Sequence, residues 1–306
     1  MRSGSPWSRA RACSTSWAYC SGLLPDSVEA VNIPGVYQRA GVTMVPWPRR
    51  CVATKGPVMD LSQLPVEQGF RMRGQQVTRV ETFVDAAFAF SLTLLVIFYN
   101  ELPDTVAELR DALRRVPTFA VCFVLLSMFW ASHNRWSRRF GMEDAKSTVL
   151  SLAFVLVVLV YVYPLRMVTS SGLSLLTGGF VPSELGMDRS QWMLDLQTAF
   201  IVYGLGFGAL SWLLWRMNVH ALRRADVLAL DATERFNTQS ESGVYALMTA
   251  SAFGSVMVSF VMLAAPVAWL NNFTVGLPMW LYSAMGMLLW AYRARRERVG
   301  PKGATA

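Results

Sequence analysis

Lysine and histidine are scarce in this chain of 306 residues, which contains only three lysines and two histidines. Its few cysteines are Cys13, Cys20, Cys51 and Cys122. No two of them have the spacing of a Cys-x-x-Cys pair or of a zinc site, so we expect unpaired thiols, no disulfide framework and no metal. The sequence also shows no serine–histidine–aspartate arrangement and no phosphate-binding loop. These absences argue against an enzyme and against a bound cofactor.

Apolar residues dominate instead, at 53% of the chain, with a mean hydropathy of +0.34. This composition indicates a polytopic membrane protein rather than a soluble domain. The formal net charge of +8 does not indicate nucleic-acid binding, because residues 1–58 hold seven Lys or Arg against two acidic residues. The remaining excess of positive charge is spread over loops, and we expect no nucleic-acid partner.

The N-terminal 70 residues show no sustained apolar period and hold seven of the fourteen prolines. They lack the apolar core of a secretory signal, so we expect a disordered tail over 1–70. An alternative is an over-extended gene start, with the native start near Met59. The membrane domain is then expected over 71–298, followed by a short tail over 299–306.

Six apolar stretches follow the tail, each close to the roughly 20 residues that a membrane-spanning helix needs. They are 80–100, 117–136, 148–168, 194–215, 244–268 and 273–292. Because only a helix satisfies its own backbone in lipid, we predict an all-α fold of six transmembrane helices. Sixteen Lys or Arg flank the spans on one side and five on the other. The excess of positive charge places both termini in the cytoplasm of a multi-pass protein of the cell membrane.

The first span carries the most informative pattern. Asp85 lies about four residues inside it, where a carboxylate costs up to roughly 2.5–3.5 kcal/mol at the helix centre and less near the interface. A carboxylate at this depth either anchors the helix by pairing with a basic residue or lies in a pore or substrate path. The two roles are compatible with each other. We expect His133, at the end of the second span, to reach Asp85 or its backbone.

An apolar stripe also runs along this span. The residues recur at i, i+4, i+7, i+11 and i+14 and are Phe83, Ala87, Phe90, Leu94 and Ile97. Spacing alone favours packing against other helices of the same subunit, because any apolar helix offers such a stripe.

The head of the span, Arg79-x-x-x-Phe83-Val84-Asp85, and the later Thr93-Leu-Leu stretch resemble the transmembrane protein 175 family of potassium channels. The second span's end, FWASHNRW, also fits that family. The resemblance implies a homotetramer that conducts potassium ions through a pore lined by the first helix. It implies a pore constriction at Phe90, Leu94 and Ile97, with the hydroxyl of Thr93 beside it. It further implies that Arg79, Phe83 and Asp85, with His133, hold the helix head.

Two residues depart from the family pattern. Phe90 is bulkier than the branched aliphatic residue usual at that ring, and Val84 replaces a serine. Two rival functions therefore stay open: a non-conducting membrane scaffold in which Phe90 plugs the axis, and a cation- or proton-coupled transporter that uses Asp85. The stretch from Thr274 to Pro278 looks like a potassium-channel filter, but no pore helix precedes it, so we set that interpretation aside.

Overall fold

The computed structural model describes residues 64–67, 69–97, 104–186, 192–264, 274 and 276–300. Contacts divide the chain into Met1–Val58 and Met59–Ala306, and all described residues lie in the second unit. The expected tail up to residue 63 and the proposed start at Met59 lie outside the described residues. Residues 64–67, 69 and 70, also expected to be disordered, instead belong to the fold: Phe70 is buried in the core, and Val66 and Glu67 pair with Arg71 and Phe70.

The described part of the chain consists of helices and one short antiparallel hairpin, in which Val66 pairs with Arg71 and Glu67 with Phe70. The elements are β1 (Val66–Glu67), β2 (Phe70–Arg71), α1 (Arg79–Ile97), α2 (Val106–Leu113), α3 (Val116–Phe140), α4 (Ala145–Leu176), α5 (Trp192–Arg223), α6 (Ala232–Ala264) and α7 (Leu277–Val299). Apart from this hairpin, the expected all-α fold is confirmed.

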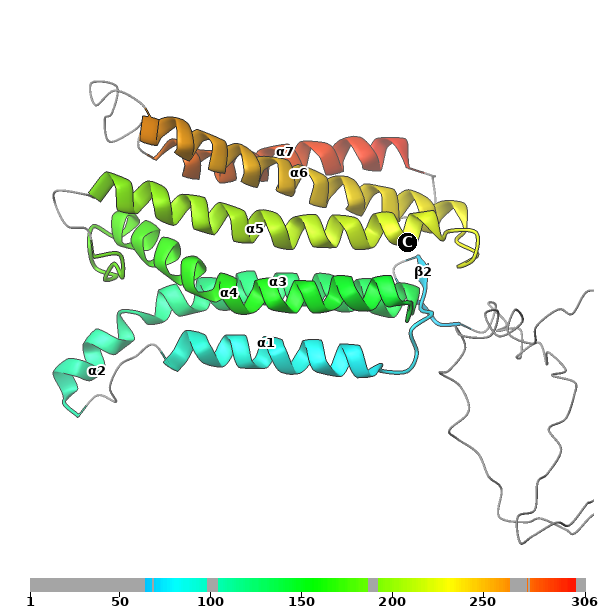
Figure 1. Cartoon of the computed structure of the whole chain (residues 1–306), viewed down its shortest axis with the longest axis horizontal. Helices are drawn as coiled ribbons and strands as arrows, with labels where there is room; N and C mark the ends of the chain where they lie inside the picture. The colour runs from blue at the N-terminus through cyan, green and yellow to red at the C-terminus, as the bar shows by residue number, and fades with distance from the viewer. Residues whose placement is uncertain are drawn as a thin grey trace, which may run out of the picture. The chain divides into compact units, whose positions relative to one another are not determined.

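Six long helices coincide with the six expected spans and run side by side in alternating directions (Figure 1). Four stretches are long and apolar enough to cross a membrane: 106–140, 145–176, 192–223 and 232–264. α1, whose described part carries three charges, and α7, which ends in arginines, are not among these four. At 1.5 Å per residue, α4, α5 and α6 measure roughly 48–50 Å and extend beyond a hydrocarbon layer of about 30 Å.

The starts of α1, α4 and α6 and the ends of α3, α5 and α7 gather at one end of the bundle (Figure 1). Most arginines of the chain lie in the segments that meet there. We call this end of the bundle the basic end. The excess of basic residues that the sequence shows on one side of the spans is therefore found at one end of the folded bundle.

Glycines let α5 pack closely between α4 and α6. A Cβ atom on Gly204 would stand 2.6 Å from Val256 of α6, and one on Gly206 would stand 2.4 Å from the ring of Tyr161 in α4. Atoms do not approach that closely, so each glycine keeps a space for its neighbour. The run Gly204-x-Gly206-x-Gly208 is thus a helix-packing motif.

Replacing Gly206 with alanine is expected to destabilise the protein by about 1–3 kcal/mol, the usual range for overpacking a tight interior. Gly172 of α4 provides the control, because nothing lies within 4 Å of a Cβ built there. Gly172→Ala should leave the melting temperature in detergent unchanged or raise it slightly, since alanine favours the helix. Equal melting temperatures for the two variants would contradict close packing at Gly206.

Candidate pore helix and its anchors

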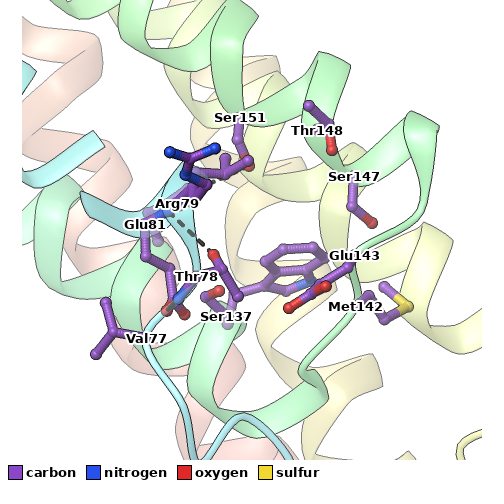
Figure 2. A pocket seen from close by; sticks show the side chains of 13 residues that line it. Val77, Thr78, Arg79, Glu81, Ser137, Met142, Glu143, Ser147, Thr148 and Ser151 are labelled. Atoms are coloured by element: carbon purple, nitrogen blue, oxygen red, sulfur yellow. Dashed lines mark hydrogen bonds between the residues drawn. The ribbon is translucent and has the colours of Figure 1, made fainter. Parts of the chain in front are cut away.

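A reciprocal capping box starts α1. The Glu81 backbone N–H donates to the Thr78 hydroxyl at 3.1 Å, and the Thr78 N–H donates to the Glu81 carboxylate at 2.8 Å. This arrangement satisfies two of the N–H groups that a helix start leaves open. Glu81 therefore has a local role at the head of the helix, beside a polar cavity of about 390 Å³ bordered by α1, α3 and α4 (Figure 2).

Two opposite faces distinguish α1. The residues of its buried face are spaced at i, i+4, i+7 and i+11, and they are Val84, Phe88, Ser91 and Leu95. The opposite face is exposed along its length and includes Thr82, Phe83, Ala86, Ala89, Phe90, Thr93 and Val96. Phe83 and Phe90 are 54% and 55% exposed, although both are large apolar residues. The described part of the protomer therefore leaves a whole side of α1 uncovered.

The predicted constriction lies along one edge of this uncovered face. Phe90 is exposed, whereas Leu94 is half-buried and packs against the core. Ile97 is the last residue of α1, and its side chain lies outside the described part of the structure. At 100° per residue, the centre of the face runs through Ala86 and Thr93. The Thr93 hydroxyl donates to the Ala89 carbonyl oxygen at 2.9 Å.

Asp85 has a different partner from the one expected. The indole N–H of Trp130 in α3 donates to the Asp85 carboxylate at 2.7 Å. His133 lies one turn further along α3, is buried, and shares a hydrogen bond of 3.0 Å with the Ser151 hydroxyl of α4. The expected contact between His133 and Asp85 is thus replaced by one from Trp130, because the His133 ring points toward α4, where it stacks on Phe154 at 5.5 Å.

The other motif residues have distinct surroundings. Arg79 is exposed and makes no ion pair with another described residue. Val84, which stands where the family pattern has serine, is 1% exposed and belongs to the hydrophobic core. The departure at Val84 therefore concerns packing inside the protomer and not the uncovered face.

The far end of α1 is held by Arg166, which lies near the end of the predicted span 148–168. Arg166 lies within α4 and is buried, at 7% exposed. Its guanidinium donates to the Leu95 carbonyl oxygen at 3.2 Å and pairs with the Glu184 carboxylate at 2.5–2.8 Å. Leu95 is in the last turn of α1, where carbonyl groups lack helical partners and favour positive charge. The only signal in the sequence was an arginine two residues after Pro164 in an apolar run.

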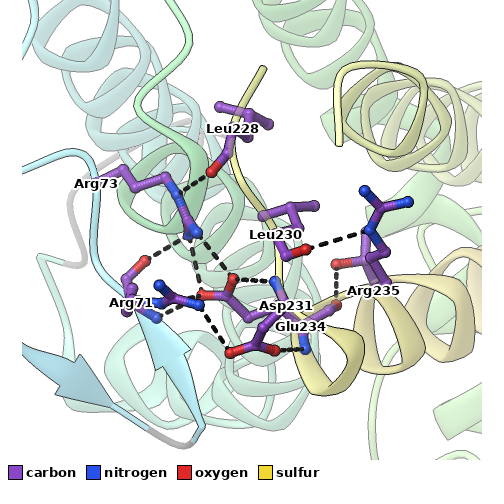
Figure 3. Close-up of polar contacts among 8 residues, drawn as sticks. Arg71, Arg73, Leu228, Leu230, Asp231, Glu234 and Arg235 are labelled. Atoms are coloured by element: carbon purple, nitrogen blue, oxygen red, sulfur yellow. Dashed lines mark hydrogen bonds and ion pairs between the residues drawn. The ribbon is translucent and has the colours of Figure 1, made fainter. Parts of the chain in front are cut away.

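The segment before α1 is fixed by an ionic network at the basic end (Figure 3). The fully buried Glu234 carboxylate accepts the Arg71 backbone N–H at 2.8 Å and two bonds from the Arg73 guanidinium at 3.0 and 2.8 Å. Asp231 forms a capping box with Glu234 at the start of α6. Burial raises the pKa of Asp231, but the Glu234 N–H and the Arg71 guanidinium outweigh it and lower that pKa below its usual value.

The same segment crosses the end of α3 at close range. The Gly74 N–H donates to the Arg138 carbonyl oxygen at 2.9 Å, and a Cβ on Gly74 would stand 2.8 Å from the Ser137 carbonyl oxygen. Gly141 ends α3 in the left-handed conformation, with φ of 55°, which favours glycine. The Arg139 guanidinium lies 4.2 Å from the Phe70 ring centre. Strand β2, α3 and α6 are therefore joined just before α1 begins.

The sequence is similar to potassium channels of one family. The family profile described as "Endosomal/lysosomal potassium channel TMEM175" matches residues 79–164. A potassium channel of Marivirga tractuosa is 30% identical over 194 residues, which cover 63% of this chain and 78% of that protein. The chain belongs to the TMEM175 family. It is accordingly a multi-pass membrane protein of a potassium-channel family and not an enzyme.

A solved structure extends the TMEM175 relationship to the fold. The crystal structure of a variant of the potassium channel MtTMEM175, in complex with a nanobody–MBP fusion protein, matches with a TM-score of 0.63 and 28% identity. The match covers 77% of this chain and 100% of that chain. The filter-like stretch after residue 273 leads directly into α7, since Leu277 and Pro278 form its first turn.

Proposed function

We propose that this TMEM175-family protein conducts potassium ions through a central pore lined by α1 from several copies. The observation that carries the proposal is the uncovered face of α1, which exposes Phe83 and Phe90 along a helix whose opposite face is buried. One helix cannot enclose a path for ions, but four copies around a symmetry axis can close one. A homotetramer would cover the face that the protomer leaves open. The Marivirga relative, which bears the name potassium channel, supports this assignment.

The pore constriction is assigned to Phe90, Leu94 and Ile97, with Thr93 beside it. A ring of apolar side chains closes a pore by excluding water. An ion passes such a ring only if it stays hydrated or if polar groups replace the water molecules of its hydration shell. Thr93 lies near the centre of the uncovered face, and its hydroxyl supplies such a polar group. Arg79, Phe83, Asp85 and His133 are assigned to the helix head, with Trp130 positioning Asp85.

The orientation follows from the distribution of basic residues. Both termini are placed in the cytoplasm, with the basic end of the bundle at the cytoplasmic leaflet of the cell membrane. In this arrangement α1 and α7 also cross the bilayer, which gives six transmembrane helices. The channel domain then extends from the β1–β2 hairpin to residue 298, with 299–306 as a short tail.

Potassium flux into liposomes tests the assignment. Phe90→Ala should raise the flux several-fold, because it removes the bulkiest side chain of the constriction, and Leu94→Ala should raise it less, because Leu94 is half-buried. Phe253→Ala is the matched control: Phe253 is an exposed phenylalanine of α6, at 44% exposure, and its loss should not change the flux.

Three results would contradict the channel. Folded protein without flux in the wild type and in both pore variants would favour a membrane scaffold in which Phe90 plugs the axis. Saturable, proton-coupled uptake that Asp85→Asn abolishes would favour a transporter. An image of the purified assembly in which α1 faces lipid would exclude a pore lined by α1.

A further inference from the structure

A second cavity, of about 420 Å³, lies between α3, α5, α6 and α7, and α1 contributes nothing to its lining. Its body is apolar and is formed by Leu125, Phe129, Phe207, Met248 and Met285. Its polar rim is formed by Ser132, Arg135, Tyr245 and Arg293. The cavity therefore changes from apolar to basic along its length.

The change from an apolar body to a basic rim runs parallel to the helix axes. Leu125 and Arg135 are ten residues apart on α3, roughly 15 Å, and Met285 and Arg293 are eight apart on α7, roughly 12 Å. Both helices run toward the basic end of the bundle, so both arginines lie at that end of the cavity (Figure 1). The apolar body thus lies deeper in the membrane and the guanidinium groups lie toward its surface.

The charges of the two arginines are not balanced within the described protomer. Arg135 and Arg293 are exposed and pair with no described carboxylate. Arg135 donates to the Ser132 hydroxyl at 3.4 Å and to the Tyr245 hydroxyl, and both of these groups are uncharged. Glu241, one turn from Tyr245 on α6, is engaged by Arg139 at 2.6 Å. Arg296, one turn past Arg293, donates to Ser240 and stacks on Phe236. Arg139 and Arg296 thus have partners within the protomer, whereas the two arginines at the cavity rim have no counter-charge among the described residues and can bind an outside anion.

We propose that this cavity binds an anionic phospholipid of the leaflet at the basic end. Guanidinium groups match the geometry of phosphate oxygens and bind them by charge-assisted hydrogen bonds. Basic pockets between transmembrane helices at the membrane surface recognise anionic head groups in this way. An acyl chain fills the apolar body, while the phosphate joins Arg135 of α3 to Arg293 of α7. The site is independent of the pore and of the orientation assigned above.

Native mass spectrometry of delipidated protein tests the site, with phosphatidylglycerol as the probe. Phosphatidylcholine and inorganic phosphate serve as comparisons, because they separate an anionic lipid from a neutral one and from a free anion. Phosphatidylglycerol should bind and raise the melting temperature, and the other two should do so far less. The double variant Arg135→Gln/Arg293→Gln should weaken phosphatidylglycerol binding about 10- to 30-fold, at roughly 1 kcal/mol for each arginine.

The matched control is Arg138→Gln/Arg295→Gln, which removes the same charge from the same two helices. Both residues are exposed and neither lines the cavity, so binding should be unchanged. Equal losses in the two double variants would overturn the proposal, as would equal binding of phosphatidylglycerol and phosphatidylcholine. Subunit dissociation of the cavity variant, with lipid binding retained, would show that a second copy of the chain covers this cavity and would also overturn it.

Discussion

Replacing Glu234 with glutamine should cost about 3–5 kcal/mol of folding free energy, the usual range for breaking a buried ion pair from one side. Glu234 is fully buried, and the Arg73 side chain that pairs with it is only 7% exposed. Glutamine keeps the size of the side chain but leaves the Arg73 guanidinium without a counter-charge inside the protein. We expect a lower melting temperature in detergent and a smaller yield of monodisperse protein.

Asp226→Asn is the control for this variant. Asp226 pairs with Arg235, but both side chains are well exposed, at 93% and 44%. Exposed pairs contribute about 0–1 kcal/mol, so the control should melt close to the wild type. If Glu234→Gln also melted like the wild type, the network would not stabilise the fold, and the segment before α1 would be held by the hairpin and glycine contacts alone.

Hydropathy was sufficient to predict the six long helices but not their full extent. Each of the six apolar runs corresponds to a long helix, because a run of about 20 apolar residues in lipid has no other regular structure available. The start of α6 lies at Ala232, twelve residues before the predicted span. Those twelve residues are mostly polar, so hydropathy gives no signal for the start of the helix. The pattern Asp231-x-x-Glu234 is a capping box and was the signal that could have placed this start.

The uncovered face of α1 was predicted only in part. Phe88 and Phe90 are equally apolar, yet one is buried and the other exposed, and the choice depends on where α3 and α4 pack. Within the predicted stripe, Phe83 and Phe90 therefore lie on the uncovered face and Ala87 and Leu94 are half-buried. Thr93 lies near the centre of the uncovered face. A stripe of helical spacing shows which residues share a face, but not which face the rest of the fold covers.

Long-range partners were the least predictable feature. Trp130 reaches Asp85 across 45 residues, and Arg166 reaches Leu95 across 71. Both residues lie in predicted spans, and neither contact can be predicted until the packing of α1, α3 and α4 is known. Both contacts hold the same helix, one near its head and one at its far end. Trp130 lies within residues 79–164, which the family profile matches, and Arg166 lies two residues beyond that region.

Arg166→Gln should reduce both stability and potassium flux, because it removes the charge that holds the far end of α1. The variant leaves Glu184 without its closest basic partner and the Leu95 carbonyl without its guanidinium donor. We expect a loss of about 3 kcal/mol in folding free energy. Potassium flux for each folded assembly should fall in parallel, because the predicted constriction at Leu94 is next to the released residue. Arg166→Lys keeps the charge but not the planar fork, so it should recover only part of both losses.

Arg115→Gln separates this anchoring role from the general loss of a positive charge. Arg115 approaches the same Glu184 carboxylate, but at 3.8 Å and with its side chain 41% exposed. Its removal should cost less than about 1 kcal/mol and leave the flux unchanged. If Arg115→Gln and Arg166→Gln had equal effects, the charge near Glu184 would matter and the bond to α1 would not. If Arg166→Gln lowered the melting temperature but not the flux of the folded assembly, Arg166 would stabilise α4 without positioning the helix that we assign to the pore.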